Sequence, residues 1–390
     1  MMIDIAEWPE DGLLRSALRG ICPADEEAAA RCRARWNRIA KPLYGLGVLE
    51  DLVVRIAAAQ GTDQVDISRK GLVVFCADNG VVEEGVSQTG QAVTAIVAEN
   101  FIVGKSCAAI MCKRAGADLF PVDAGMAVDT PRVEKRKCRR GTANMTKGPA
   151  MMRREAVFAI EAGISKALEL EKAGYRILAA GEMGIGNTTT SAAVTAVLLG
   201  MDPAEVTGRG AGLSDEGLRK KTDAIRRAID INRPDPEDPL GVLSKVGGFD
   251  IAALTGLFLG GASLRVPVVI DGVISAVAAL IAARLEPSCR DYMLPSHISG
   301  EPAAMAVMTA LGLIQEEQET EQGKLFREKE FGKKGPGPAV SPILHAGMHL
   351  GEGTGAVALF PLLDMAVDIY YKMDTFEGIA VEQYRDYDAE

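Results

Sequence analysis

Four short apolar stretches of the chain end in the same way, on an acidic residue with a glycine nearby. They read GLVVFCADNG (71–80), DLFPVDAG (118–125), YRILAAGEMG (175–184) and VPVVIDG (266–272). Such runs, each followed by a helical segment, are typical of parallel strands joined by crossover helices. A single acid–glycine ending could be only a turn. Four of them predict a common polar rim at the carboxyl edge of a sheet, where α/β proteins bind ligands.

Helix-forming segments alternate with these strands. We predict helices over 91–115, 151–173, 188–199, 215–231, 274–284 and 303–315, with two more inside 24–60 that are separated at KPLYGLG. The stretch from residue 355 onward is also largely helical. This alternation predicts a doubly wound parallel α/β sheet of the Rossmann-like kind. The helices at both ends of the chain lead us to expect a small helical domain built from the termini.

The domain boundaries follow from this order. We expect residues 1–66 to be the N-terminal part of the small domain, 67–314 to be the α/β domain, and 343–390 to complete the small domain. Residues 315–342 form a charged insertion by our expectation, because the stretch 315–340 (QEEQETEQGKLFREKEFGKKGPGPAV) is dense in both charges and ends in a Gly/Pro tract. Such a composition favours an exposed insertion or mobile loop, with its acidic beginning prolonging the preceding helix.

Charge and cysteine usage exclude several classes of function. The chain has 390 residues and a net charge of −10, whereas nucleic-acid binders usually carry a basic face. Its seven cysteines contain no C-x-x-C pair, which favours reduced thiols in a cytoplasmic protein. The N-terminus lacks the pattern of a signal peptide, and the apolar region 251–285 is interrupted by Arg265 and Asp271, so we expect no membrane span.

Three glycine-rich loops are candidates for ligand binding. GEMGIGN (181–187) differs from the G-x-G-x-x-G fingerprint of dinucleotide-binding proteins and lacks the G-K-[ST] of a P-loop, but it opens a helix that Asn187 or Thr188 could cap. Free N–H groups and the helix dipole suit a phosphate there; a tight turn is the alternative. TGRGAGLSDEGLRKK (207–221) also precedes a helix with lysines that could contact a phosphate; a turn followed by a capped, solvated helix is the alternative. HLGEGTGA (349–356) places Glu352 between two glycines as a candidate general base, and here too a simple turn is the alternative.

The sequence gives little support to a metal or covalent mechanism. His345 and His349 stand four residues apart in HAGMH, which lacks the glutamate of H-E-x-x-H. We find no G-x-S-x-G nucleophile motif and no cysteine beside an obvious base. We therefore expect no metal and no cofactor. Phosphate-type loops with isolated carboxylates fit group transfer from a donor that is already activated and phosphorylated.

The loops together resemble nicotinate-nucleotide:dimethylbenzimidazole phosphoribosyltransferases, which assemble the lower-ligand nucleotide of cobalamin. The resemblance rests on eight stretches in family order, namely ARWNRIAKPLYGLGVLEDL, DNGVVEEGVSQTGQAVT, RGTANMTKGPAM, GEMGIGNTTTSAA, GRGAGLSDEGL, DGVISA, SHISGEPA and LGEGTGA. It implies transfer of phosphoribose from nicotinate mononucleotide to a benzimidazole nitrogen, with inversion at the ribose anomeric carbon, giving α-ribazole 5′-phosphate and nicotinate. It also implies a homodimer. The expectation that no nucleic acid binds comes from the net charge instead.

The resemblance assigns roles to individual residues. It makes Glu352 the general base and places Glu182 in the active site. The residues that it implies for the phosphate and ribose are Gly184, Gly186, Asn187, Thr188, Gly210, Lys221 and Ser299, with Lys220 one position away from Lys221. For the aromatic base it implies Ser87, Gln91 and Leu350. His297 and Asp271 also lie in matching motifs, where we interpret them as structural hydrogen-bonding residues.

Two departures from the family pattern bear on specificity. KPLYGLG stands where the family usually has KPPGSLG, a change that we expect to be local. GVSQTGQ lacks an aromatic residue in the base-binding stretch, which leaves the preferred acceptor open between dimethylbenzimidazole, other benzimidazoles and a purine.

Two other classes of function stay open as well. One is an NAD-dependent oxidoreductase, which the reversed glycine spacing disfavours, and the other is a non-catalytic ribotide- or base-binding relative, which would have no need of Glu352 as a base.

Overall fold

The computed structural model describes residues 12–314, 318–332 and 340–385. Its centre is a six-stranded sheet in the order β3-β2-β1-β4-β5-β6, with every neighbouring pair parallel. The strands are β1 (Lys70–Ala77), β2 (Ala117–Gly125), β3 (Glu134–Lys135), β4 (Ile177–Met183), β5 (Val268–Ile270) and β6 (Met293–Pro295). This is the doubly wound order, so the predicted Rossmann-like fold is confirmed. The short strands β3 and β6 were not predicted.

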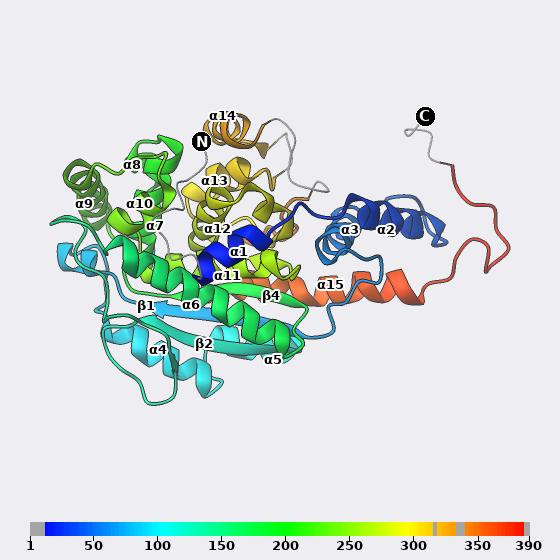
Figure 1. Cartoon of the computed structure of the whole chain (residues 1–390), viewed down its shortest axis with the longest axis horizontal. Helices are drawn as coiled ribbons and strands as arrows, with labels where there is room; N and C mark the ends of the chain where they lie inside the picture. The colour runs from blue at the N-terminus through cyan, green and yellow to red at the C-terminus, as the bar shows by residue number, and fades with distance from the viewer. Residues whose placement is uncertain (1–11, 315–317, 333–339, 386–390) are drawn as a thin grey trace.

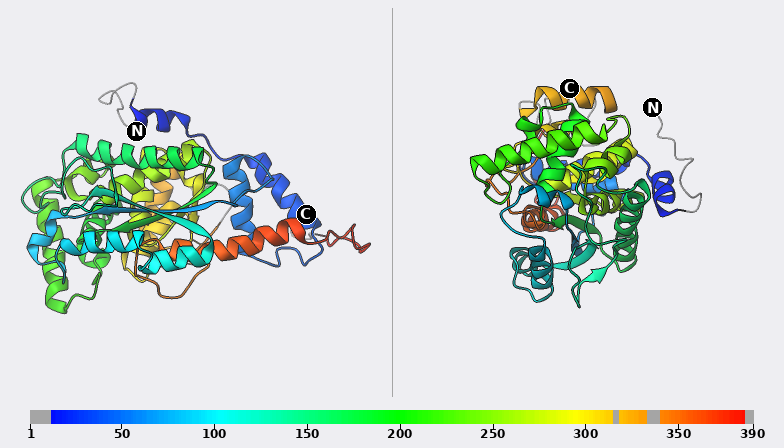
Figure 2. Two further views of the ribbon diagram at one scale, coloured as in Figure 1. Left: turned by 90° about the horizontal axis from the view of Figure 1, so that it is seen from below. Right: turned by 90° about the vertical axis from the view of Figure 1, so that its left-hand side faces the viewer.

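Helices cover both faces of the sheet (Figures 1 and 2). On one face lie α6 (Arg153–Lys172) and α11 (Phe249–Ser263), and on the other lie α4 (Ala92–Ile102), α5 (Cys107–Ala115) and α15 (Thr354–Lys372). The remaining helices near the sheet are α7 (Asn187–Leu199), α8 (Pro203–Val206), α9 (Asp215–Asn232), α10 (Pro239–Val246), α12 (Val273–Leu285), α13 (Ala303–Leu311) and the 3₁₀ turns η2 (Gly80–Glu84) and η3 (Pro287–Tyr292).

The packing of α6 on α11 depends on glycine. A Cβ atom added to Gly163 would lie 1.9 Å from the carbonyl oxygen of Ala253, and one added to Gly256 would lie 1.8 Å from that of Ile160. The two backbones therefore approach one another more closely than any side chain allows. All eight residues of β1 are buried, as expected for a central strand covered on both faces.

The terminal helices form a separate group at one end of the sheet (Figure 1). Here α2 (Glu26–Arg38) and α3 (Val48–Gln60) pack with one another, and α15 packs on α3. The ring of Trp36 lies 5.2 Å from that of Tyr370, and Arg35 donates to the Tyr370 carbonyl. The first helix differs from our expectation for residues 1–66, because α1 (Leu13–Gly20) packs on α6 and α11 instead.

Two predictions about helices are wrong. Residues 91–115 form two helices, since α4 ends at Ile102, α5 begins at Cys107, and Gly104 between them has a φ of +72°. The charged segment is also less exposed than expected. Within it, α14 (Glu321–Phe331) packs on α13, the ring of Phe326 is buried, and buried Arg327 pairs with Glu319. An amphipathic face that composition alone did not reveal anchors this helix. Residues 315–317 and 333–339 of the segment lie outside the described residues.

Two helical stretches of the described chain are long and apolar enough to cross a membrane, 92–115 and Thr354–Lys372. The first is the broken pair α4 and α5. The second, α15, packs against α3, α5 and β4. A core helix meets the same length and composition test, and α15 is one. The pair α4–α5 instead leaves several apolar side chains exposed, namely those of Ile96, Ile102, Val103 and Ile110.

Candidate active site

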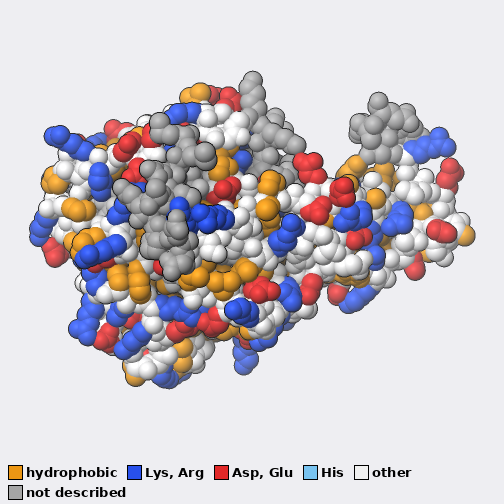
Figure 3. Space-filling view, viewed as in Figure 1, with side chains coloured by type: hydrophobic (Ala, Val, Ile, Leu, Met, Phe, Trp, Pro, Cys, Tyr) orange, Lys and Arg blue, Asp and Glu red, His pale blue; other side chains and the backbone are white. Residues whose placement is uncertain are grey.

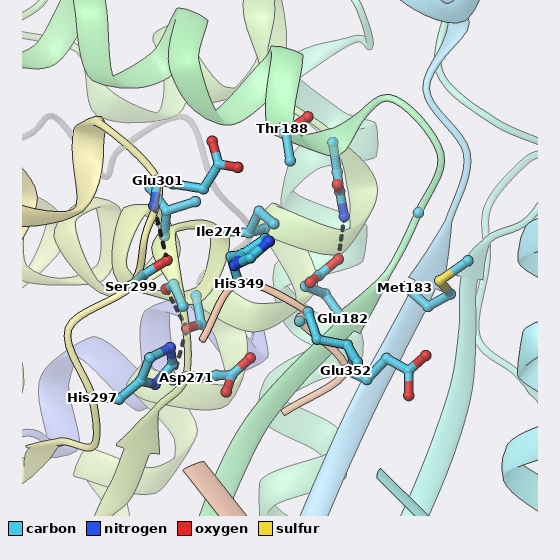
Figure 4. Close-up of a pocket in the computed structure, with 17 residues that line it drawn as sticks. Glu182, Met183, Thr188, Asp271, Ile274, His297, Ser299, Glu301, His349 and Glu352 are labelled. Atoms are coloured by element: carbon cyan, nitrogen blue, oxygen red, sulfur yellow. Dashed lines mark hydrogen bonds between the residues drawn. The ribbon is translucent and has the colours of Figure 1, made fainter. Parts of the chain in front are cut away.

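The predicted polar rim is present at the carboxyl ends of the strands. Asp78 after β1, Asp123 in β2, Glu182 in β4 and Asp271 after β5 are all buried there. A pocket opens on the β4–β5–β6 side of this rim (Figure 4). It is lined by residues from four segments of the chain, namely 182–188, 271–275, 297–301 and 349–352. On the outer surface, acidic and basic side chains intermingle (Figure 3).

The first glycine loop turns from β4 into α7 at this pocket. Gly186 caps the helix in the left-handed conformation with a φ of +93°, so the predicted cap at Asn187 or Thr188 is wrong by one or two positions. Asn187 and Thr188 are instead the first helical residues, and both line the pocket with Gly184. A Cβ atom at Gly184 would lie 2.2 Å from the carbonyl oxygen of Ala77, so this glycine lets the loop contact β1.

The second glycine loop reaches the first through a buried lysine. Lys221 Nζ donates to Thr188 Oγ1 over 2.8 Å and to the Gly208 carbonyl over 2.9 Å. Burial lowers the pKa of Lys221 to about 8, and nearby Glu301 acts in the opposite direction. Lys220 instead pairs with Glu216 at the surface. Of the two adjacent lysines, Lys221 is therefore the one beside the pocket. Gly210 lies here as well, since a Cβ atom on it would be 2.9 Å from Thr188 Oγ1.

Glu182 is one of the buried acids of the pocket. Its carboxyl accepts a hydrogen bond from Asn187 Nδ2 (Figure 4). Burial raises the pKa of Glu182 to about 8, and the neighbouring carboxylates Asp250 and Asp271 add to the rise. Glu182 therefore holds its proton at neutral pH.

Asp250 is a residue of this acidic cluster that sequence reasoning missed. It lies in the first turn of α11, and burial raises its pKa to about 6 even though its Oδ1 accepts a hydrogen bond from the Ile251 N–H. The signal was present as VGGFD (246–250), where an acid again follows glycines. It stood at the start of a helix rather than at the end of a strand, so the strand pattern did not include it.

Glu352 lies in an unusual backbone conformation at the edge of the pocket. Its φ is +61°, a region that costs an L-residue with a side chain about 1–2 kcal/mol. The half-buried carboxylate points away from Glu182 and accepts a 3.4 Å hydrogen bond from the Ala108 N–H at the start of α5. Burial raises the pKa of Glu352, while that N–H group favours its charged form.

A second, apolar hollow adjoins the first. It is lined by Cys107, Met111, Gly347, Met348, His349, Leu350 and Thr354, so it shares His349 and Leu350 with the pocket. Because Ala108 follows Cys107 in α5, the carboxylate of Glu352 lies beside this hollow. A flat aromatic ring suits such a lining.

The other predicted residues are divided between the pocket and its surroundings. Ser299 lines the pocket, as do His297 and Asp271. Gly186, Ser87 and Gln91 do not line the pocket or the apolar hollow in the described part of the chain. Gln91 Nε2 donates to the Asn79 carbonyl over 3.1 Å, in the segment that leads from β1 into α4. Among the described residues, no three His, Cys, Asp or Glu side chains converge as metal ligands.

Comparison with known proteins identifies the family. A model of a family described as phosphoribosyltransferase matches residues 21–315 and 339–381. The nicotinate-nucleotide–dimethylbenzimidazole phosphoribosyltransferase of Acetivibrio thermocellus is 44% identical over 375 residues, covering 96% of this chain and 99% of that protein. The chain belongs to this family of phosphoribosyltransferases. The enzyme of the same name from Ruminiclostridium cellulolyticum is also 44% identical, over 95% of this chain and 98% of its own length.

Solved structures of the phosphoribosyltransferase family have the same fold. The crystal structure of CobT from Thermus thermophilus has a TM-score of 0.81 and 38% identity to this chain, covering 92% of it and all of the other. The family model leaves out residues 316–338, which contain α14. The family resemblance read from the eight motifs is therefore confirmed, and α14 lies in a segment that the family model does not match.

Proposed function

We propose that this chain transfers phosphoribose from nicotinate mononucleotide to a benzimidazole-type base, giving α-ribazole 5′-phosphate and nicotinate for the nucleotide loop of cobalamin. The observation that carries this proposal is that a phosphate-binding type of loop and the loop of the candidate base line the same pocket. The glycine turn before α7, with the buried Lys221 behind it, lies at one side, and the loop with Glu352 lies at the other. The relatives named above carry the same activity in their names.

The donor would lie with its phosphate toward Lys221. The side chains of Thr188 and Ser299 and the start of α7 supply hydrogen-bond donors there, and an anion stabilises the charged form of a lysine whose pKa burial has lowered. Glu182, neutral at pH 7, brings no negative charge to a donor that already carries a phosphate. Its protonated carboxyl can instead donate a hydrogen bond to a ligand oxygen.

The reaction itself requires one base. A benzimidazole nitrogen attacks the anomeric carbon of the ribose, the bond to nicotinate breaks, and its electron pair neutralises the pyridinium ring that leaves. Attack from the opposite side converts the β into the α configuration. The other benzimidazole nitrogen then gives its proton to Glu352, whose carboxylate also stabilises the positive charge that develops on the ring. The two glutamates thus have different roles. Burial keeps Glu182 protonated, whereas Glu352 is only half-buried and acts as the base.

The acceptor base would occupy the apolar hollow beside Glu352. Cys107, Met111 and Leu350 offer it apolar surface, and His349 borders both hollows. Ser87 and Gln91 enter this proposal from the family motif GVSQTGQ, on the segment between η2 and α4. This lining contains no Phe, Tyr or Trp side chain, which suits several flat bases of similar size.

We also propose a cytoplasmic homodimer. The exposed apolar side chains of Ile96, Ile102, Val103 and Ile110, on α4, α5 and the turn between them, are the surface that we propose for self-association. The small helical domain would consist of α2, α3 and the C-terminal part of α15, with the α/β domain between them and 315–342 as an insertion.

Replacement of Glu352 by glutamine tests the proposal. The variant keeps the shape of the side chain and removes its basicity, so transfer from nicotinate mononucleotide to dimethylbenzimidazole should fall by about 10²- to 10⁴-fold while donor affinity is retained. Release of nicotinate and formation of α-ribotide are followed by chromatography, with a panel of benzimidazoles and adenine as acceptors. Near-normal turnover of the variant would refute the role of Glu352, and donor binding without any product from the unaltered protein would refute the transfer reaction.

A further inference from the structure

The loop that carries Glu352 enters α15 through three consecutive residues with positive φ. These angles are +84° at Gly351, +61° at Glu352 and +81° at Gly353. Glycine adopts this region freely, but Glu352 does so only at a cost. A residue keeps such a conformation only where its surroundings hold it there. The question is therefore which contacts hold Glu352 in place.

The start of α15 has no cap of its own. Its N-cap residue is Gly353, which offers no side chain to the free N–H groups of the first turn. Asp271 supplies the missing acceptor from the end of β5. Its Oδ2 accepts from the Gly353 N–H over 3.1 Å, and its Oδ1 accepts from Gly355 and Ala356 over 2.7 and 3.1 Å. One carboxylate from a distant part of the chain thus takes the place of an N-cap side chain.

Asp271 is itself held firmly. It is 5% exposed, and its backbone N–H donates to Ser275 Oγ over 2.9 Å. His297 closes the neighbouring side, since a Cβ atom on Gly355 would lie 2.0 Å from His297 Nδ1. The groups facing this cluster are therefore His297 after β6, Glu182 in β4 and Glu352 in the loop.

We propose that Asp271 is a positioning residue for the transfer reaction, which caps α15 and thereby holds Glu352 in the left-handed conformation that directs its carboxylate to the acceptor base. This inference rests on the proposed role of Glu352 as the base. Asp271 acts through the loop and takes no proton from the substrate. A displacement of about 1 Å in a catalytic group is enough to lower a rate by about 100-fold.

Replacement of Asp271 by asparagine tests this role. The amide keeps one oxygen and presents an NH₂ group to at least one of the three N–H donors, so at least one capping bond is lost. We expect kcat to fall by about 10- to 100-fold, with less than a threefold change in KM for nicotinate mononucleotide. Amide hydrogen exchange of the peptide spanning 351–357 should become about tenfold faster. If the asparagine variant does not fold, Asp271→Ser, which keeps one oxygen acceptor, takes its place with the same expected results.

Asp123→Asn is the matched control. Asp123 is also buried at the rim and accepts backbone N–H groups, from Gly125 and Met126 over 3.1 and 2.8 Å, but these lie at the end of β2. Its replacement should lower stability and leave both kcat and the exchange of 351–357 close to those of the unaltered protein. A role of Asp271 in general stability alone would make the two variants behave alike, which would refute the inference.

A double variant separates this inference from the proposed base. If Asp271 acts through Glu352, adding Asp271→Asn to Glu352→Gln should cost less than a further threefold in kcat, because the group being positioned has already lost its function. Multiplication of the two losses would refute the inference. A Glu352→Gln variant that retains its turnover would overturn the proposed function first. An impaired Glu352→Gln with an unimpaired Asp271→Asn would overturn only the positioning role.

Discussion

Replacement of Glu182 by glutamine should stabilise the protein at neutral and alkaline pH. In the folded protein, burial raises the pKa of the Glu182 carboxyl from 4.5 to about 8. In the unfolded chain the same carboxyl loses its proton near its ordinary pKa of 4.5. The proton is therefore bound more tightly in the folded state. Its contribution to stability is complete below pH 4.5 and is lost progressively as the pH rises toward 8.

The size of the effect follows from the same shift. One unit of pKa corresponds to about 1.4 kcal/mol, so ionisation of Glu182 costs at most about 5 kcal/mol of the free energy of unfolding by pH 8. Asp250 and Asp271, with pKa values raised to about 6, act in the same direction at lower pH. Glutamine cannot ionise, but its amide oxygen can still accept the hydrogen bond from Asn187.

Urea denaturation at pH 5, 6, 7, 8 and 9 measures this difference. The free energies of unfolding of the two proteins should diverge steadily from pH 5 to pH 8, with the glutamine variant the more stable. Glu216→Gln is a suitable control, because Glu216 is exposed and its pairing with Lys220 lowers its pKa. Parallel pH profiles for the unaltered protein and Glu182→Gln would refute the argument, since Glu182 would then ionise as readily in the folded protein as in the unfolded chain.

Two further predictions concern the phosphate side of the pocket and the packing of the fold. Lys221→Ala should weaken binding of nicotinate mononucleotide by about 10- to 100-fold, as measured by calorimetry, and should affect binding of dimethylbenzimidazole less. Lys220→Ala should leave both affinities unchanged. Similar losses in both variants would contradict the assignment. Gly163→Ala should destabilise the protein by about 3 kcal/mol or more, because its Cβ would collide with the Ala253 carbonyl. Gly90→Ala is the control, because a Cβ there meets open space and should change the melting temperature by little. Equal melting temperatures of the two variants would contradict the close packing of α6 and α11.

Much of this protein could be predicted from local sequence patterns. The acid–glycine endings located β1, β2, β4 and β5, and they also located the polar rim. This worked because buried parallel strands are short apolar runs, and each must end in a turn. The family motifs led to Glu352 and to the lysine pair, since Glu352 lies within a glycine loop and Lys220 and Lys221 follow another such loop in α9. All of these signals span fewer than about 20 residues.

Other features were decided only by contacts between distant segments. The choice between Lys220 and Lys221 depends on which face of α9 meets Thr188, and the burial of α14 depends on its contact with α13. The capping of α15 by Asp271 joins groups more than eighty residues apart in the chain. The sequence by itself indicated four of the strands, many of the helices and most of the polar side chains that stand at the strand ends. Which of those side chains meet, and how burial changes their pKa values, was decided by the tertiary structure, because desolvation and capping depend on neighbours that only the folded sheet brings together.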